Sequence, residues 1–310
     1  MQEENNSFKH QNDEIDLREV LHVLLEGKWI IGTVVAFFSV TVVFFSLSLP
    51  NIYQSRALLT PIAPTDNISG ALSSYSGLIN LAGVRLPSQG AESNAVKAME
   101  KMHSLSFFES DILPNINLPE LMAMDSWDPM TNEIKFNEDI YLKASNKWVR
   151  KFSYPKKLVP SAQESFERFH KRHFFLSEDK KTGFISLRIQ HQSPLIAKEW
   201  AELVIDQINT FYREKDKTEA EKAVNYLNNQ IRKTNLAEIK EVIANLLQQE
   251  TQKLTLIEAS EAYVFDYIDP PAVMEKKIAP TRSKICIIGA LLGGIFGVLI
   301  VLLRHYFFRK

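Results

Sequence analysis

Two long runs of apolar residues, one near each end, dominate the hydrophobic pattern of this chain. The runs at residues 29–49 and 285–303 carry no charge and are about 21 and about 19 residues long, enough for a helix to cross a bilayer core of ~30 Å. A cleaved signal peptide is the competing interpretation of the first run, but it would have a shorter apolar core and a small-residue cleavage site. The pattern therefore predicts two transmembrane helices, at 29–49 and 285–303.

The short segments outside these runs predict the orientation, because the long segment between them escapes the positive-inside rule. Lys28 precedes the first run, and Arg304, Arg309 and Lys310 follow the second. Basic residues at both ends place both termini in the cytoplasm. We therefore expect a bacterial inner-membrane protein with a cytoplasmic segment at 1–28, a periplasmic domain at 50–284 and a cytoplasmic tail at 304–310.

An amphipathic pattern precedes the first run. Asp16 and Glu19 have the spacing of a capping box, which marks the start of a helix. One apolar stripe follows, made of Leu17, Val20, Leu21, Leu24 and Leu25. This helix is expected to lie on the cytoplasmic leaflet or to pack on a partner, or else to be a simple extension of the first span.

Strand and helix periods alternate between the two runs, which predicts an α+β domain. Strands are expected at 52–60, 184–190 and 264–268, and helices at 94–108, 161–175, 194–234 and 237–259. The Gly- and Ser-rich segment 65–92 is expected to be a loop, and scattered prolines argue against long elements at 110–160. Because the strands come from distant parts of the chain, the helices between them must leave the sheet and return.

The helix expected at 194–234 is the longest element of this domain. Ser193 and Pro194 suit its N-cap and first position, and its length would be ~60 Å. It should therefore protrude or bundle with copies of itself, and the charged stretch 213–219 is expected to be exposed on all sides. We expect a base from 50–192 and 260–284, a long protruding helix, and a helical return segment, the two helices together covering 193–259.

Composition and motifs predict little chemistry. The formal net charge of −1 gives no reason to expect nucleic-acid binding, and the single cysteine, Cys286, lies in the second apolar run. There is no phosphate loop, no H-E-x-x-H motif and no acid–base or nucleophile cluster, so no catalytic residue, cofactor or metal is expected. His170 and His173, within the basic sequence FHKRH, are expected on a solvated helix face rather than at a metal.

Two features exceed this background. Gly289, Gly293 and Gly297 are spaced four apart in the second span, with Gly294 adjacent, and such a strip lets another helix approach closely. Its partner would be the first span or a different protein. A possible basic patch, for an anionic lipid, a pyrophosphate or an acidic polymer, lies in the Lys- and Arg-rich segment 143–181, although a solvated surface is the favoured alternative; its residues are Lys147, Arg150, Lys151, Lys156 and Lys157.

Five segments, in this order, resemble the Wzz-type chain-length determinants, the polysaccharide co-polymerases of bacterial surface-glycan assembly. They are IDLREVLHVLLEGKW (15–29), NIYQSRALLTP (51–61), SGLINLAGV (76–84), ISLRIQHQSPLIAKEWAELVIDQIN (185–209) and DPPAVMEKKIAPTRSKICIIGALLGGIFG (269–297). The family's proline-rich segment usually has several evenly placed prolines. Here only Pro270, Pro271 and Pro280 are present, which leaves the geometry of that segment open.

The resemblance implies a non-enzymatic regulator that sets the length of a lipid-linked glycan made by a Wzy-type polymerase. It also implies ring- or bell-shaped homo-oligomers at the membrane, with an α/β base and projecting helices. Because no nucleotide-binding domain follows the second span, the kinase-free branch associated with O-antigen or related glycans is expected. The alternatives are a capsule or exopolysaccharide export co-polymerase that works with a separate tyrosine kinase, a two-span membrane sensor, and a membrane-bound enzyme.

Overall fold

The computed structural model describes residues 17–62, 91–260 and 262–308. The chain forms two compact units. The first combines the two ends of the chain, up to Asn51 and from Ile278, and the second consists of Ile52–Lys277. The second unit is a mixed domain of helices and strands, as the sequence predicts.

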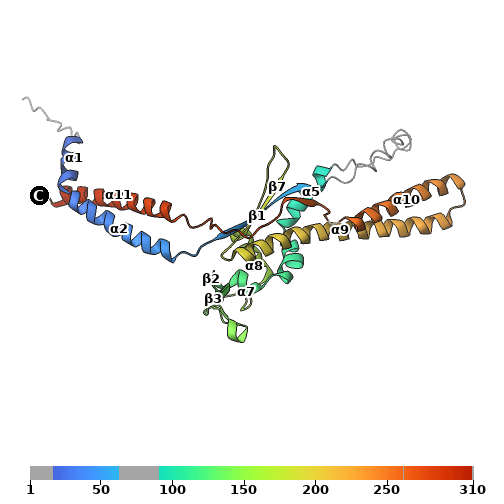
Figure 1. Cartoon of the computed structure of the whole chain (residues 1–310), viewed down its shortest axis with the longest axis horizontal. Helices are drawn as coiled ribbons and strands as arrows, with labels where there is room; N and C mark the ends of the chain where they lie inside the picture. The colour runs from blue at the N-terminus through green and yellow to red at the C-terminus, as the bar shows by residue number, and fades with distance from the viewer. Residues whose placement is uncertain (1–16, 63–90, 261, 309–310) are drawn as a thin grey trace, which may run out of the picture. The chain divides into compact units, whose positions relative to one another are not determined.

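Three helices make up the described part of the terminal unit: α1 (Leu17–Glu26), α2 (Lys28–Ser48) and α11 (Arg282–Phe308). The α2 and α11 helices lie side by side (Figure 1), and both are long and apolar enough to cross a membrane. The α2 helix matches the predicted span to within one residue at each end, whereas α11 is longer than 285–303 at both ends. Gly27 separates α1 from α2, and Asp16 of the predicted capping box lies outside the described residues.

A four-stranded antiparallel sheet forms the framework of the second unit, in the order β6-β7-β1-β8. Its strands are β1 (Tyr53–Pro61), β6 (Phe174–Glu178), β7 (Ile185–His191) and β8 (Phe265–Asp269). Alternate residues of the central strands β1 and β7 are buried, including Ala57, Leu59 and Leu187, because one face of the sheet is covered by helices. The sequence predicted three of these strands and missed β6.

The long helix α9 (Pro194–Lys233) begins where predicted, with Ser193 as its N-cap and Pro194 in its first turn. Its first half packs on the buried face of the sheet, and there Trp200, Val204 and Ile208 are almost fully buried. The α10 helix (Ala237–Ala259) then returns along its second half, so that the two form a hairpin (Figure 1).

The charged stretch 213–219 is not exposed on all sides, contrary to the prediction, because the end of α10 and the chain after it pack against it. Tyr263 Oη donates a hydrogen bond of 2.6 Å to Asp216 Oδ2, and Lys217 Nζ lies 2.6 Å from Glu258 Oε1. Each of these contacts joins residues far apart in the chain. The charges in this stretch therefore connect the two arms of the hairpin where it leaves the sheet.

Shorter elements cover the remaining surface of the domain. They are α5 (Ala91–Met102), α6 (Leu105–Phe107), a π-helical turn at Phe108–Ile112, 3-10 turns at Leu113–Asn115 and Lys143–Ser145, α7 (Leu118–Met122), α8 (Ala162–Arg172), and two small hairpins formed by β2 (Met124–Asp128) with β3 (Glu133–Phe136) and by β4 (Tyr141–Leu142) with β5 (Lys147–Trp148). The helix expected at 94–108 ends early because Ser104 caps a new turn, accepting a hydrogen bond from Phe107 N. The expected loop at 65–92 lies almost entirely outside the described residues.

The predicted α+β class is confirmed, with a long helix, a helical return segment and two apolar helices at the ends. Its core joins the inner face of the sheet to α5, α8 and α9.

Candidate functional site

The glycines of α11 face α2. A Cβ atom at Gly289 would lie 2.5 Å from Val42 Cγ2, and one at Gly297 would lie 3.0 Å from Ile31 Cα. At Gly293 the nearest atom would be Phe38 Cβ, at 2.9 Å. These distances are shorter than ordinary van der Waals contacts, so these three positions have no room for a larger side chain.

The two neighbouring glycines differ in their surroundings. No atom of the described residues lies within 4 Å of a Cβ placed at Gly294, so this residue is not part of the contact with α2. At Gly27, which the sequence pattern did not single out, a Cβ would meet the side chain of Val301. A glycine directly before an apolar span is the signal that could have identified it. The Phe38 and Phe296 rings also stack, with centroids 5.4 Å apart.

The three predicted proline positions are divided between the two units. In the second unit Pro270 is exposed and Pro271 is buried directly after β8. The buried Ser55 of β1 donates a hydrogen bond of 3.0 Å to Ala272 O, which fixes the start of this segment beside the sheet. Pro280 lies in the terminal unit, two residues before α11, and follows a cis peptide bond.

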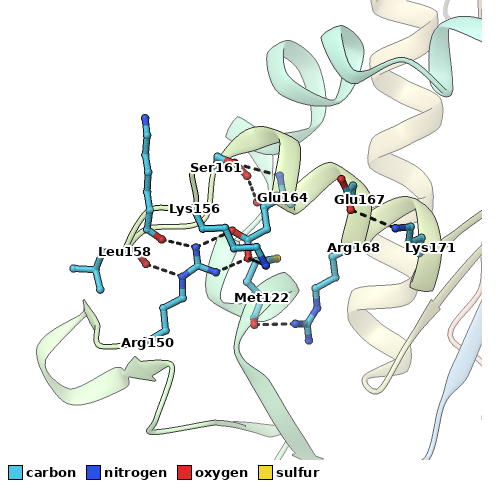
Figure 2. A network of polar contacts seen from close by, with 11 residues as sticks. Met122, Arg150, Lys156, Leu158, Ser161, Glu164, Glu167, Arg168 and Lys171 are labelled. Atoms are coloured by element: carbon cyan, nitrogen blue, oxygen red, sulfur yellow. Dashed lines mark hydrogen bonds and ion pairs between the residues drawn. The ribbon is translucent and has the colours of Figure 1, made fainter. Parts of the chain in front are cut away.

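Within the predicted basic patch, Arg150 is distinct from the four lysines. Lys147, Lys151, Lys156 and Lys157 are exposed. The Arg150 side chain is only 12% exposed and makes a bidentate ion pair with Glu164, with N–O distances of 2.5 and 2.8 Å (Figure 2). It also donates hydrogen bonds to the carbonyls of Lys157 and Leu158. Arg150 therefore fastens the loop between β5 and α8 and is not free to bind an anion in this state.

The same ion pair sets the electrostatics of the neighbouring surface. Hydrogen bonding to the Arg150 guanidinium holds the pKa of Glu164 below its ordinary value. A hollow of about 750 Å³ beside it is lined by Arg150, Glu164, Arg168 and Asp139, among others. Arg168 donates one hydrogen bond to Met122 O at 3.1 Å (Figure 2), while its buried Nε has no partner in the part of the chain that the structure describes. The hollow thus contains both signs of charge.

A cluster of buried and half-buried histidines lies where α8, β7 and α9 meet. His173 and His191 have ring centroids 5.4 Å apart, and both contact Trp200. His170 lies nearby against His103 and Phe174. The expectation that His170 and His173 lie on a solvated helix face is therefore wrong for His173, which packs against Trp200, whereas His170 is half-buried against Phe174 and keeps part of its surface exposed.

Burial controls the protonation of this histidine cluster. It lowers the pKa of His170 and of His173 to about 4, and that of His191 to about 3. His173 Nδ1 lies 2.7 Å from Gln190 O, and His191 Nδ1 accepts a hydrogen bond from Ser193 N at 3.1 Å. Neutral rings fit these contacts. Among the described residues, no group of three or more His, Cys, Asp or Glu side chains is arranged to bind a metal ion.

The fold defines a protein with two helices of membrane-spanning length, packed along a glycine face, and a mixed α/β domain between them in the sequence. Residues 13–105 match the family of Wzz chain length determinant proteins. This confirms the resemblance to that family over the part of the chain that contains α1, α2 and β1. Among curated proteins, none matches this sequence.

The solved structures similar to this one include two polysaccharide co-polymerases. A full-length bacterial polysaccharide co-polymerase has 13% identity and a TM-score of 0.41, with 94% of this chain and 98% of that chain covered. A fragment of WzzB, a polysaccharide co-polymerase from Salmonella Typhimurium, has 13% identity and a TM-score of 0.33, with 74% and 100% covered. TM-scores below 0.5 do not establish a common fold, and such low identities transfer no residue roles.

Proposed function

We propose that this protein is a non-enzymatic regulator of polysaccharide chain length. The regulated polysaccharide would be O-antigen or a related lipid-linked glycan, made by a Wzy-type polymerase. The match of residues 13–105 to chain length determinants is the observation on which the proposal rests. Two apolar helices around an α/β domain with a long helical hairpin are consistent with it.

The proposed topology places both termini in the cytoplasm of a bacterium and Ile52–Lys277 in the periplasm. The basic residues beside the apolar helices support this orientation. In α1, Leu21 and Leu25 are 61% and 65% exposed, which would suit contact with the cytoplasmic leaflet. The packing of Gly289, Gly293 and Gly297 on α2 would join the two spans into one membrane unit.

The protein is proposed to act as a homo-oligomer. One face of α10 packs on α9. On its outer face α10 carries an apolar stripe of Ile239, Val242 and Leu246, which are 46%, 58% and 44% exposed. Their spacing is that of a coiled-coil seam. An exposed seam on a long hairpin would be covered by association with further copies.

Gene deletion tests the proposed function. Surface glycan from the deletion strain, separated on a gel, is expected to lose its modal length and to regain it when the wild-type gene is restored. An unchanged length distribution would refute chain-length control. Complete loss of surface polymer would instead favour the capsule or exopolysaccharide export alternative.

Self-association is tested separately by the size of the purified full-length protein in detergent. Val242→Lys and Leu246→Lys are expected to reduce the oligomer mass, whereas Asn245→Lys, at an exposed position outside the stripe, should preserve it. If all three variants retain the wild-type mass, the outer stripe is not the interface.

A further inference from the structure

One face of the four-stranded sheet is polar and, among the described residues, is not covered by a helix. Gln54 and Arg56 of β1 point to this face and stand opposite Gln190 and Arg188 of β7. Gln190 Nε2 donates a hydrogen bond of 3.2 Å to Gln54 Oε1. The two glutamines therefore pair with each other, while the arginines form a pair of like charge.

Direct opposition of Arg56 and Arg188 is electrostatically unfavourable. Residues in register on adjacent strands have Cβ atoms ~4.5–5.5 Å apart, and a like-charged pair directly opposite each other is destabilising. Neither arginine has an ion-pair partner within the described part of the chain. An anion between the two guanidinium groups would turn the repulsion into a pair of charge-assisted contacts.

The two arginines also have hydrogen-bond donors that the described residues do not satisfy. Arg56 Nε donates to Ser186 Oγ at 3.1 Å. Arg188 lies over the Phe175 ring, with 6.0 Å between its guanidinium carbon and the ring centroid, and among the described residues its buried Nε has no hydrogen-bond partner. The stacking positions the Arg188 fork but leaves donor capacity unused.

A hollow of about 530 Å³ surrounds this pair. Besides both arginines, its lining includes the polar residues Gln54, Ser177 and Ser186 and the acidic residues Glu178 and Asp179. Glu178 and Asp179 would repel a small, fully charged anion such as free phosphate. They would accept hydrogen bonds from a ligand that carries hydroxyl groups as well as one anionic group.

We propose that this hollow binds an acidic saccharide, whose carboxylate or phosphate lies between Arg56 and Arg188. The sugar hydroxyl groups would hydrogen-bond to Glu178, Asp179 and the serines that line the hollow. That the ligand is a saccharide rests on the proposed function; that it carries an anionic group rests on the arginine pair. The site would let the protein contact the growing glycan directly, by binding the acidic sugar units of that glycan.

Ligand-observed saturation-transfer NMR on the full-length protein tests the proposal, in a detergent with neither a sugar nor a phosphate headgroup. The probes are D-glucuronate, D-glucose as the neutral control, and inorganic phosphate as competitor. Arg56→Gln and Arg188→Gln are each expected to weaken glucuronate binding about tenfold, the effect of losing one hydrogen bond to a charged group. Lys97→Gln removes the same charge from an exposed position of α5 and should bind as wild type does.

Binding of glucuronate but not of glucose, with the loss in both arginine variants, supports the site. Displacement of glucuronate by phosphate would indicate that a phosphate-bearing sugar is also accepted, and no displacement would indicate a carboxylate ligand. Equal binding of glucose and glucuronate, binding of phosphate alone, absence of all binding, or wild-type affinity in the variants would overturn the proposal.

Separate controls distinguish misfolding of a variant, failure of the site and failure of the proposed function. Near-ultraviolet circular dichroism should match wild type in Arg56→Gln, because Arg56 is exposed, and this variant remains decisive if Arg188→Gln misfolds. If the deletion strain keeps its glycan length while glucuronate binds, chain-length control fails and the site stands. If glycan length changes but glucuronate does not bind, the site fails and the proposed function stands.

Discussion

Lowering the pH from 7 to 5 is expected to destabilise the domain Ile52–Lys277 through its buried histidines. His173 and His191 are largely buried, and their pKa values are lowered to about 4 and about 3, first of all by desolvation. In the unfolded chain their pKa values return to ~6.5. As the pH falls below 6.5, the unfolded chain therefore takes up protons that the folded domain excludes, and folding stability is lost until the folded pKa values are reached.

The size of the effect follows from these values. A histidine whose pKa is ~6.5 unfolded and about 4 folded loses about 2 kcal/mol of stability between pH 7 and pH 5. His173 and His191 together should therefore contribute a loss of about 4 kcal/mol. The half-buried His170 adds less, because solvent screens its charge. Glu120 and Asp206, whose pKa values are raised by burial, act in the opposite direction and reduce the net loss.

Chemical unfolding of the full-length protein in detergent, at constant ionic strength, measures this loss. The probe is near-ultraviolet circular dichroism, because Trp200 contacts both histidines. His191→Asn keeps an acceptor for Ser193 N, and it should reduce the pH-dependent loss by about 2 kcal/mol. His22→Gln, at an exposed position of α1, is the matched control.

Two results would refute the reasoning. One is a free energy of unfolding that is the same at pH 5 and pH 7. The other is a pH dependence in His191→Asn as steep as that of the wild type, because then the titration would come from groups outside this cluster.

Three further substitutions test packing and polar contacts by thermal or chemical unfolding. Gly293→Leu should destabilise the contact of α11 with α2 by about 1–3 kcal/mol through overpacking, and Gly294→Leu should not; equal effects would refute the assigned face. Arg150→Gln should lower the free energy of unfolding by about 2 kcal/mol, because the ion pair with Glu164 is lost, while Lys151→Gln should be nearly neutral. Similar losses in both variants would contradict the role of Arg150 in holding the loop between β5 and α8. Asn209→Ala should cost about 2–4 kcal/mol, because the buried amide hydrogen-bonds to the backbone of Val264 and Phe265; wild-type stability would show that these bonds are replaced.

Long, regular patterns made most of the fold predictable from the sequence. The helices at 194–234 and 237–259 were found almost to the residue, because an apolar period persists over many turns and Ser193 caps the first of them. The strand at 184–190 was found from its alternation alone. The β4 and β5 strands have two residues each, which is too short for any period to be detected.

The polar contacts were not predictable, because their partners are distant in the sequence. His170 and His173 lie among lysines and arginines, which suggests a solvated surface, but His170 packs against Phe166 and Phe174, and Trp200 and His191 from other elements cover His173. Arg150 likewise has basic neighbours, and its partner Glu164 lies on the following helix. Local charge indicates exposure only where no other element packs on the segment.

The glycine strip of α11 faces α2 of the same chain, and this contact limits which other partners it can have. Gly289, Gly293 and Gly297 pack on the first span of the same chain, so they are not available to another membrane protein while that contact exists. At Gly294 and, on α2, at Gly32, a Cβ atom would have no described atom within 4 Å, so both positions remain open to a second helix. Substitutions on the two faces therefore separate two causes of altered glycan length. A change of length in Gly293→Leu with lowered stability reflects the fold of the terminal unit, whereas a change in Gly294→Leu at wild-type stability requires a partner at that open face.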